Sequence, residues 1–202
     1  MGLTVRAYRE GDDAALYDVC LRTGADGDDA SALYRDPCLL GEVYVGPYLR
    51  FAPEFAFVAE DDEGVGGYAL GTADTVAFEA ACESSWWPAL RRRYPLEETP
   101  LGTRDAELVR LIHHPPAKPA ELVRAYPAHV HVDLLPWLQG RGYGRRLMTT
   151  LFDRLARAGA AGVHLGVSAR NTRAIGFYQH LGMDIRSRTD HGLIMTLPLS
   201  PR

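Results

Sequence analysis

The stretch that decides the fold is residues 129–158, HVHVDLLPWLQGRGYGRRLMTTLFDRLARA. At its start, apolar residues at 130, 132 and 134 alternate with polar ones, which is the period of a β-strand. Pro136 has no N–H for a strand ladder, so we expect the strand to end before it. Farther on, apolar residues recur at helical spacing, as Leu147, Met148, Leu151, Phe152 and Leu155. The stretch therefore predicts a strand, a glycine-rich turn and an amphipathic helix.

The turn between strand and helix, residues 139–144, has the properties of an anion site. Backbone N–H groups at a helix start point toward one spot, and the positive end of the helix dipole lies behind them. Phosphates are the most natural ligands of such a turn, and Arg141, Arg145 and Arg146 add positive charge. The turn lacks the GK[ST] of a P-loop and the G-x-G-x-x-G spacing of a dinucleotide fold. A tight turn without any ligand remains the alternative.

Two motifs in this sequence resemble one enzyme family. Residues 139–144, QGRGYG, are similar to the Q/R-x-x-G-x-G/A acyl-CoA signature of the GNAT superfamily of N-acetyltransferases. Downstream, residues 171–183, NTRAIGFYQHLGM, resemble the family's N-x-x-A-x-x-F-Y-x-x-L-G-F segment, with Met183 in place of the usual Phe. Segments such as LYDVCLRTG and YPAHVHVDLLP extend the resemblance, over nearly the whole chain, to bacterial acetyltransferases related to the acetyltransferase-like domain of nuclear O-GlcNAcase.

This resemblance implies a fold. The alternation of strand and helix patterns along the chain already indicates an α/β (α+β) domain with helices on both faces of one sheet. The GNAT fold adds a mixed, mostly antiparallel sheet of about seven strands. Its central strands, here 130–135 and 163–168, splay apart to admit the cofactor's pantetheine arm. We expect a single domain, residues 1–202, with helical elaborations around 25–52 and 75–127.

Local patterns predict the other elements. We expect strands at 4–8, 55–60 and 65–72, with an acidic hairpin turn between the last two. Helices are expected at 30–36 and 41–50, after a first helix capped by Asp12 or Asp13. A long helix is expected at 75–93, in which Trp86 and Trp87 either pack in the core or line an acceptor cleft. Residues 101–128 predict only a proline-bounded loop. The C-terminal part predicts a helix at 172–181 and closing strands at 184–188 and 193–197.

The resemblance also implies cofactor-binding residues. Backbone groups of Leu134 and Leu135 would position the pantetheine and the acyl carbonyl. The backbone amides of Arg141, Gly142, Tyr143, Gly144 and Arg145 would hold the pyrophosphate, and Gln139 and Gly140 of the same turn are also expected to bind the cofactor. Asn171 would bond the cofactor arm, although its side chain could instead cap the following helix.

Three side chains are candidates for the chemistry. Tyr178 matches the family tyrosine that protonates the departing thiolate, the alternative being a core tyrosine on an apolar helix. His129, His131 and Asp133 share one face of the strand, which is unusual for a buried central strand. His131 and Asp133 would lie nearest the catalytic gap, so either could be the general base, directly or through a bound water. A satisfied polar network under a loop is the alternative for this pair.

The amino-acid composition limits which other classes of protein this chain can belong to. The chain has 202 residues, 47% of them hydrophobic and 24% charged, as in an ordinary globular protein. Its net charge of -4 argues against general nucleic-acid binding, and no apolar run reaches the length of a membrane span. Three cysteines without a C-x-x-C pair favour reduced thiols and a cytoplasmic protein. Neither the acidic residues 26–29 nor His113-His114 has the spacing of a metal site, so we expect none.

The sequence thus predicts an N-acetyltransferase that moves an acetyl group from acetyl-CoA to a primary amine by direct attack in a ternary complex. The acceptor is left open between a small molecule and a lysine of a peptide or protein. No nucleic-acid or membrane partner is expected, and a homodimer is compatible with the sequence. The competing hypothesis is a non-catalytic module that binds acyl-CoA or another protein.

Overall fold

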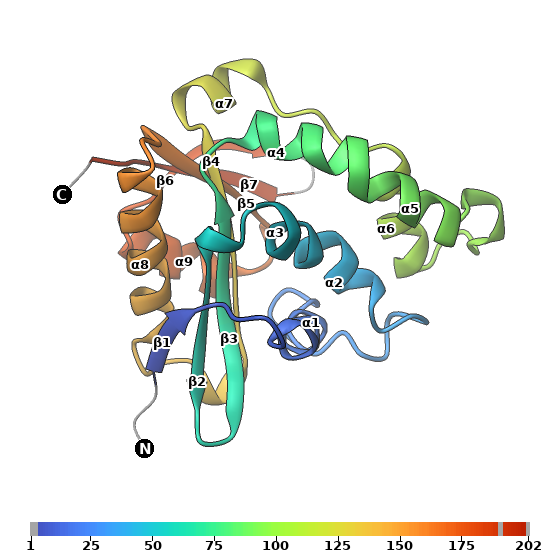
Figure 1. The fold of residues 1–202 in the computed structure, drawn as a ribbon, viewed down its shortest axis with the longest axis horizontal. Helices are drawn as coiled ribbons and strands as arrows, with labels where there is room; N and C mark the ends of the chain where they lie inside the picture. The colour runs from blue at the N-terminus through green and yellow to red at the C-terminus, as the bar shows by residue number, and fades with distance from the viewer. Residues whose placement is uncertain (1–3, 190–191, 201–202) are drawn as a thin grey trace.

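The computed structural model describes residues 4–189 and 192–200. These residues form a seven-stranded sheet in the order β1-β2-β3-β4-β5-β7-β6 (Figure 1). Neighbouring strands pair antiparallel except for β4 and β5, which are parallel. The strands are β1 (Thr4–Ala7), β2 (Ala56–Asp61), β3 (Gly64–Thr72), β4 (Ala128–Leu134), β5 (Gly162–Val167), β6 (Asp184–Thr189) and β7 (Gly192–Pro198). The mixed, mostly antiparallel sheet predicted from the resemblance is confirmed.

The two parallel strands separate soon after they meet. Their pairing is limited to Ala128 with Val163 and His129 with His164. Strand β4 then continues alongside β3 as far as the pair of Gly67 and Leu134. The edge of β4 that faces β5 therefore lacks a strand partner over its second half, which confirms the predicted splay.

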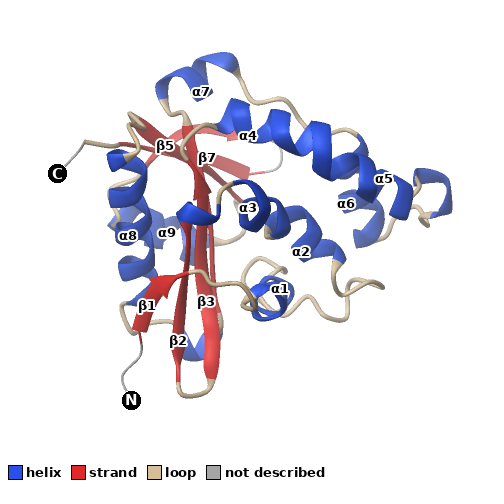
Figure 2. Ribbon diagram, viewed as in Figure 1, coloured by secondary structure: helices blue, strands red, loops and turns tan. Residues whose placement is uncertain are grey.

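Helices cover both faces of the sheet (Figure 2). On one face α8 (Tyr143–Arg157) packs on β2, β3 and β4 with the apolar residues that the periodicity predicted, and α9 (Thr172–His180) lies beside it (Figure 1). On the other face α1 (Asp13–Leu21) and α3 (Gly46–Phe51) contact β3. The core fills both interfaces, with Leu16, Tyr68, Leu70, Leu147, Met148 and Leu151 each fully buried.

The helical layer departs from the sequence prediction in several places, the first at residues 30–36. The helix expected at 30–36 is wrong, because these residues form turns. The Arg35 N–H donates to the Asp105 carboxylate at 3.2 Å, and the Asp36 carboxylate accepts from the Cys38 N–H at 2.8 Å. Side chains thus take backbone donors that a helix would need. The helix expected at 41–50 is present as α2 (Leu39–Tyr44) and α3, with a break at Val45.

The helices around residues 75–127 are more extensive than predicted. The long helix is present as α4 (Thr75–Ala81) and α5 (Trp87–Arg93), joined by a π-helical segment, Cys82–Trp86. The irregularity fits Pro88, which removes a donor from the first turn of α5. The loop expected at 101–128 contains α6 (Arg104–His113) and α7 (Ala120–Ala125). The signal missed was Thr103, whose hydroxyl accepts from the Ala106 N–H at 3.1 Å as a helix cap.

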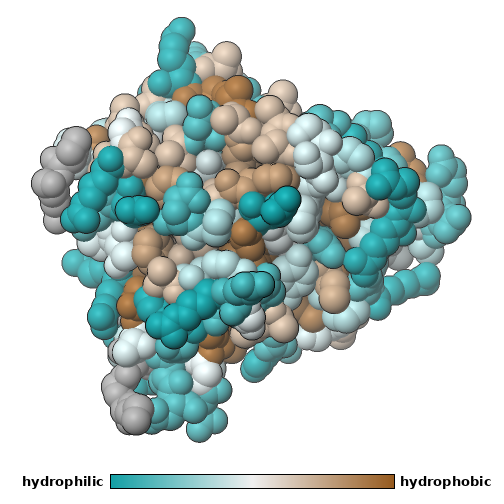
Figure 3. Space-filling model, in the orientation of Figure 1, coloured by the Kyte–Doolittle hydropathy of each residue, from teal (hydrophilic) through white to brown (hydrophobic). Residues whose placement is uncertain are grey.

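The surface seen in Figure 3 mixes hydrophilic and hydrophobic residues, and it is most hydrophilic at the end formed by α5 and the residues after it. The basic residues Arg91, Arg92 and Arg93 occupy the last turn of α5, where they complement the helix dipole. Arg91 also pairs with Glu83 at 2.6 Å, so this basic run needs no nucleic acid to explain it. In residues 4–189 and 192–200, no helix combines the length and the apolarity needed to cross a membrane.

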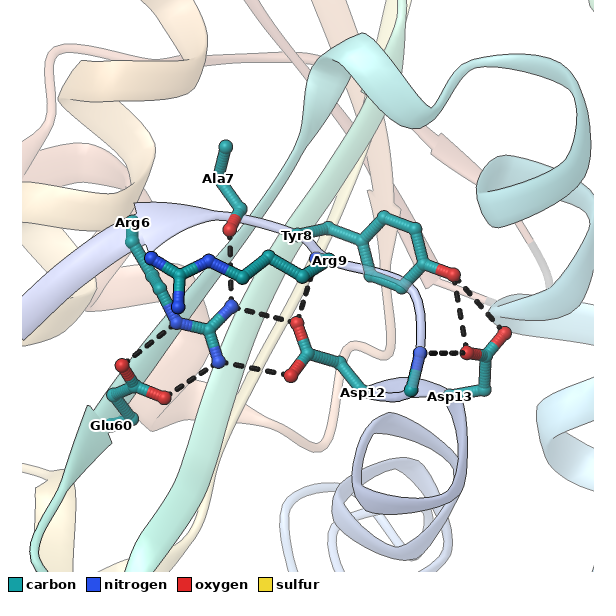
Figure 4. Close-up of polar contacts among 8 residues, drawn as sticks. Arg6, Ala7, Tyr8, Arg9, Asp12, Asp13 and Glu60 are labelled. Atoms are coloured by element: carbon teal, nitrogen blue, oxygen red, sulfur yellow. Dashed lines mark hydrogen bonds and ion pairs between the residues drawn. The ribbon is translucent and has the colours of Figure 1, made fainter.

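An ionic cluster around Arg6 ties together β1, β2 and the start of α1 (Figure 4). The guanidinium donates twice to the Asp12 carboxylate, at 2.7 and 2.9 Å, and twice to the Glu60 carboxylate, at 2.7 and 2.6 Å. Asp12 or Asp13 was expected to cap α1; Asp12 occupies the N-cap position, but its side chain makes no cap hydrogen bond. These bonds from Arg6 lower the pKa of both carboxyl groups.

Arg6→Met is expected to reduce the free energy of unfolding by about 2 kcal/mol near neutral pH, between the values for exposed and buried ion pairs. Because the folded-state pKa values of Asp12 and Glu60 are depressed, their contribution is complete above about pH 4.3 and is lost as the pH falls through the folded values. Urea unfolding of both proteins over an acid pH series checks this. If the difference in unfolding free energy between the two proteins stayed constant with pH, the assigned role of the Arg6 ion pairs would be contradicted.

Candidate active site

A cavity of about 360 Å³ opens where β4 and β5 separate. Most residues that the sequence assigned to cofactor binding or catalysis line it, namely Asp133, Leu134, Gln139, Gly140, Gly142, Gly144, Arg145, Asn171 and Tyr178. Four others are outside the lining: His131, Leu135, Arg141 and Tyr143. The splay, the glycine-rich turn and α9 thus converge on one space.

The glycine-rich turn forms one wall of this cavity. Gly140 and Gly142 have φ of +71° and +84°, a left-handed conformation that favours glycine. Gly142 is the N-cap of α8, and its carbonyl accepts the first helical bond from the Arg146 N–H at 3.1 Å. A Cβ at either glycine would have no neighbour within 4 Å, so the space beside the helix start is open. The turn therefore presents open N–H groups of a helix N-terminus, which is the geometry of an anion site.

Two contacts fix the turn to the sheet. The Gln139 side-chain amide donates to the Leu134 carbonyl at 2.7 Å, which closes the loop back onto the end of β4. The Trp137 ring lies against Gly66, where an added Cβ would come within 2.1 Å of the ring. The glycine at 66 thus allows the segment Pro136–Leu138 to pack onto β3.

Successive backbone N–H groups at this end of β4 point in opposite directions, so the N–H groups of Leu134 and Leu135 face different sides. The Leu135 N–H donates to the Gly66 carbonyl at 2.8 Å, so its backbone faces β3. In an antiparallel ladder the next residue along the strand faces the other way. The N–H groups of Val132 and Leu134 therefore point into the gap beside β5. Leu135 itself is buried, with 3% of its surface exposed.

Tyr178 projects from α9 and lines the cavity. Its side chain is buried, and within residues 4–189 and 192–200 its hydroxyl makes no hydrogen bond. Burial raises the pKa of the phenol, and the nearby negative charge of Asp133 raises it further. The hydroxyl is therefore protonated near neutral pH and free to donate into the cavity.

Asp133 and His131 lie together with Tyr68, which the sequence reasoning missed. The Tyr68 hydroxyl donates to Asp133 Oδ2 at 2.5 Å, and His131 Nε2 is 3.0 Å from the same oxygen. Tyr68 is fully buried, and burial together with the Asp133 charge raises its pKa well above the ordinary value. Asp133 reaches the cavity, whereas His131 lies behind it and stacks on Tyr44 with ring centroids 5.6 Å apart.

His129 belongs to a different environment farther down β4. Its Nδ1 is 2.8 Å from the Thr75 hydroxyl, which in turn donates to the Pro127 carbonyl at 2.7 Å. Because that hydroxyl has one proton, His129 Nδ1 must be the donor to Thr75. Burial lowers the pKa of His129 to about 3, so its ring is neutral near pH 7. His129 is therefore part of the packing around α4, away from the cavity.

Asn171 is a helix cap that also lines the cavity. Its side-chain oxygen accepts from the Ala174 N–H at 3.0 Å, as the N-cap of α9. The side-chain NH2 points toward Gly27, 3.6 Å from where a Cβ would lie. Both alternatives from the sequence, helix capping and cofactor contact, are compatible with this placement, because they use different atoms of the amide.

The loop after α1 supplies lining residues that no sequence pattern indicated. Thr23 and Gly27 line the cavity, and Gly27 lies beside the start of α9, where an added Cβ would be 3.6 Å from the Asn171 side-chain nitrogen. The acidic residues 26–29 form a turn, which hydrogen bonds between Ala25 and Asp28 close. Asp26 also forms an ion pair with Arg170 at 3.2 Å.

Trp86 and Trp87 pack within the helical layer, where the Trp86 indole donates to the Glu42 carbonyl at 2.8 Å.

The family model for the acetyltransferase (GNAT) family matches residues 28–183 of this chain. The chain belongs to this family. It is therefore a GNAT acyltransferase by fold and family, as the two motifs predicted.

Individual relatives agree. The chain is 40% identical to SsHAT, a crystal structure with which it shares a TM-score of 0.91 over 98% of both chains. It is 28% identical over 181 residues to protein O-GlcNAcase of Rattus norvegicus, covering 89% of this chain and 20% of that protein. The chain thus spans about a fifth of the length of its curated O-GlcNAcase relatives, including that of Mus musculus. The predicted link to O-GlcNAcase-related acetyltransferases is confirmed.

A more distant neighbour has a ligand. The structure of yncA from Salmonella typhimurium, solved with its cofactor acetyl-CoA, aligns with a TM-score of 0.58 and 17% identity, covering 100% of this chain and 96% of that one. At this identity the likeness concerns the fold alone.

Proposed function

We propose that this protein is an N-acetyltransferase that moves the acetyl group of acetyl-CoA directly to a primary amine in a ternary complex. One observation carries the proposal: a single cavity at the β4–β5 splay combines an anion-binding helix start, a free phenol and a carboxylate. The helix start suits the pyrophosphate of an acyl-CoA, the phenol suits its departing thiolate, and the carboxylate suits the ammonium group of the acceptor. The acetyl-CoA held by yncA supports the choice of donor.

The donor would be held by backbone groups and amides. The N–H groups of the turn from Gly140 to Arg145 would bind the pyrophosphate, helped by the positive end of α8. The Leu134 N–H, which points into the gap, would bond the acyl arm or its carbonyl. Leu135 would contribute only through burial, because its own N–H is bonded to Gly66. The Asn171 NH2 group remains available to the arm.

Asp133 is the stronger candidate for the general base, because it reaches the cavity and His131 does not. An amine enters as an ammonium ion, and Asp133 would take one proton from it. The free amine attacks the thioester carbon, so a C–N bond forms and the C–S bond breaks. Tyr68 and His131 would position the carboxylate through its Oδ2 atom.

Tyr178 would protonate the departing thiolate of CoA. The nitrogen gives up its second proton as the amide forms, and this proton restores the phenol, while Asp133 releases the proton it took from the ammonium ion to solvent. Its raised pKa keeps the phenol protonated at neutral pH, and Tyr178 shares the lining of the cavity with Asp133 of β4.

Tyr178→Phe is expected to lower kcat by about 10²-fold and to leave the Kd for acetyl-CoA within a few-fold, because only one oxygen is removed. The assay follows free thiol from acetyl-CoA with a panel of amines, and calorimetry gives the Kd. Unchanged turnover would exclude Tyr178 as the acid. Tight acetyl-CoA binding without turnover on any amine would instead favour the non-catalytic module.

The acceptor proposed is an amine on a small molecule or on a lysine of a peptide or protein, and an amine panel with both classes separates them. A cytoplasmic location fits the three cysteines, Cys20, Cys38 and Cys82, which are all free.

A further inference from the structure

Cys20 of α1 lies next to the Asp133–His131 pair. One ligand atom from each of the three residues lies within 4.8 Å of the other two. Cys20 is 2% exposed, and burial together with the Asp133 charge raises the pKa of its thiol. The three atoms come from two elements, α1 and β4, that the fold brings together on one face of the sheet.

One polar atom of this cluster is unsatisfied. His131 Nε2 is inaccessible to solvent and makes no well-directed hydrogen bond, although it is 3.0 Å from Asp133 Oδ2. A buried ring nitrogen without a partner is uncommon in native proteins, and such atoms often have a ligand-binding or catalytic reason.

The donor set selects the kind of ion. Thiolate, imidazole and carboxylate are the ligands of Zn²⁺, at about 2.3, 2.0 and 2.1 Å from the metal. Ligand atoms around such a tetrahedral ion are roughly 3.5 Å apart, so small side-chain adjustments would suffice here. Mg²⁺ and Ca²⁺ prefer sets of oxygen atoms, and this cluster offers one carboxylate only.

We propose that Cys20, His131 and Asp133 form a site for one zinc-class divalent cation, and that its occupation inhibits acetyl transfer. The ion binds Cys20 Sγ, His131 Nε2 and an Asp133 carboxylate oxygen, and water completes the coordination. The thiol proton leaves to solvent as the metal–sulfur bond forms. Inhibition follows because the positive charge of the bound ion lowers the proton affinity of the Asp133 carboxylate. This last step rests on the proposed function, whereas binding of the ion does not.

Cobalt(II) tests binding independently of activity. Titrating the full-length protein with Co²⁺ should produce a thiolate-to-metal charge-transfer band that saturates at one equivalent. The band should be absent in Cys20→Ala and Cys20→Ser, neither of which has a thiol at this position. Cys38→Ala is the matched control, because Cys38 is exposed and would be the obvious adventitious thiol. No band in the wild type, or a band that is lost in Cys38→Ala and kept in Cys20→Ala, overturns the site.

Turnover tests the inhibition. Zn²⁺ should inhibit the wild-type enzyme reversibly, with activity restored by a chelator. Cys20→Ala should keep its metal-free turnover and require more than about 100-fold more Zn²⁺ for the same inhibition, since even an outer-shell partner is worth about 10–100-fold in metal affinity. Equal Zn²⁺ sensitivity in both proteins refutes the inhibitory role. Absence of turnover in metal-free wild type, with the cobalt band present, would instead reject the proposed function and leave the site standing.

Discussion

Asp133→Asn is expected to lower kcat for amine acetylation by about 10²–10⁴-fold, the usual contribution of a general base. The replacement has nearly the same shape, and its side-chain oxygen can still accept the hydrogen bond from Tyr68. What it loses is the ability to take a proton from the ammonium ion. Steady-state kinetics with acetyl-CoA and the best amine of the panel measure the effect, and the Kd for acetyl-CoA should change little.

His131→Gln is the matched comparison for the same prediction. If His131 only positions Asp133, its replacement should cost less than about 10-fold in kcat, and the double variant should be no slower than Asp133→Asn, because residues that act as a unit are not additive. A large loss in His131→Gln with normal turnover in Asp133→Asn would transfer the base to His131. Rescue of Asp133→Asn at high pH, where the amine loses its proton to solvent, would further support proton removal as the missing step.

Gly142→Asp is expected to produce the largest loss of acetyl-CoA binding. Its carboxylate would lie at the N-terminus of α8, where the pyrophosphate is proposed to bind. At about 5 Å, repulsion between two unit charges amounts to roughly 1–3 kcal/mol for effective dielectric constants between 80 and 20. The added side chain also requires the left-handed conformation at φ +84°, which disfavours most residues.

Gly142→Asn separates charge from shape. Asn has the same size as Asp, and both tolerate a left-handed backbone. A Cβ at position 142 meets no neighbour within 4 Å, so either side chain fits. Calorimetry should therefore show weaker acetyl-CoA binding for Asp than for Asn by about 10–100-fold at low salt. The difference in affinity between the two variants should decrease as the salt concentration rises, because added ions screen exposed charges. Equal affinities for the two variants would mean that no phosphate lies beside Gly142.

The two motifs made the fold and the position of the glycine-rich turn predictable. Gly140 and Gly142 allow a left-handed backbone just where helix α8 starts, and this conformation depends on neighbouring residues along the chain. The same holds for the alternation along β4 and the apolar spacing of α8, which the structure reproduces. The wrong helix at residues 30–36 has a long-range cause: its side chains are compatible with a helix, but Asp105, far along the chain, takes the Arg35 N–H.

The catalytic half was only partly predictable, for a physical reason. Sequence alternation placed His131 and Asp133 on one face of a strand, but it could not tell which of them reaches the cavity. Which of the two reaches the cavity depends on where β4 separates from β5. Their pairing stops at His129 and His164. The register between β3 and β4, which sets Tyr68 opposite Asp133, and the packing of α1, which brings Cys20 to the same pair, are long-range contacts.

The amino-acid sequence by itself determined what depends on neighbours along the chain: the strand, the turn that can bind an anion, and the helix that supplies Tyr178. The tertiary structure decided which side chains meet. It turned the Leu135 N–H toward β3 and left that of Leu134 to the gap, because antiparallel pairing alternates. It also joined Asp133 to Tyr68, His131 and Cys20, because residues far apart in sequence become neighbours only when the sheet and its covering helix assemble.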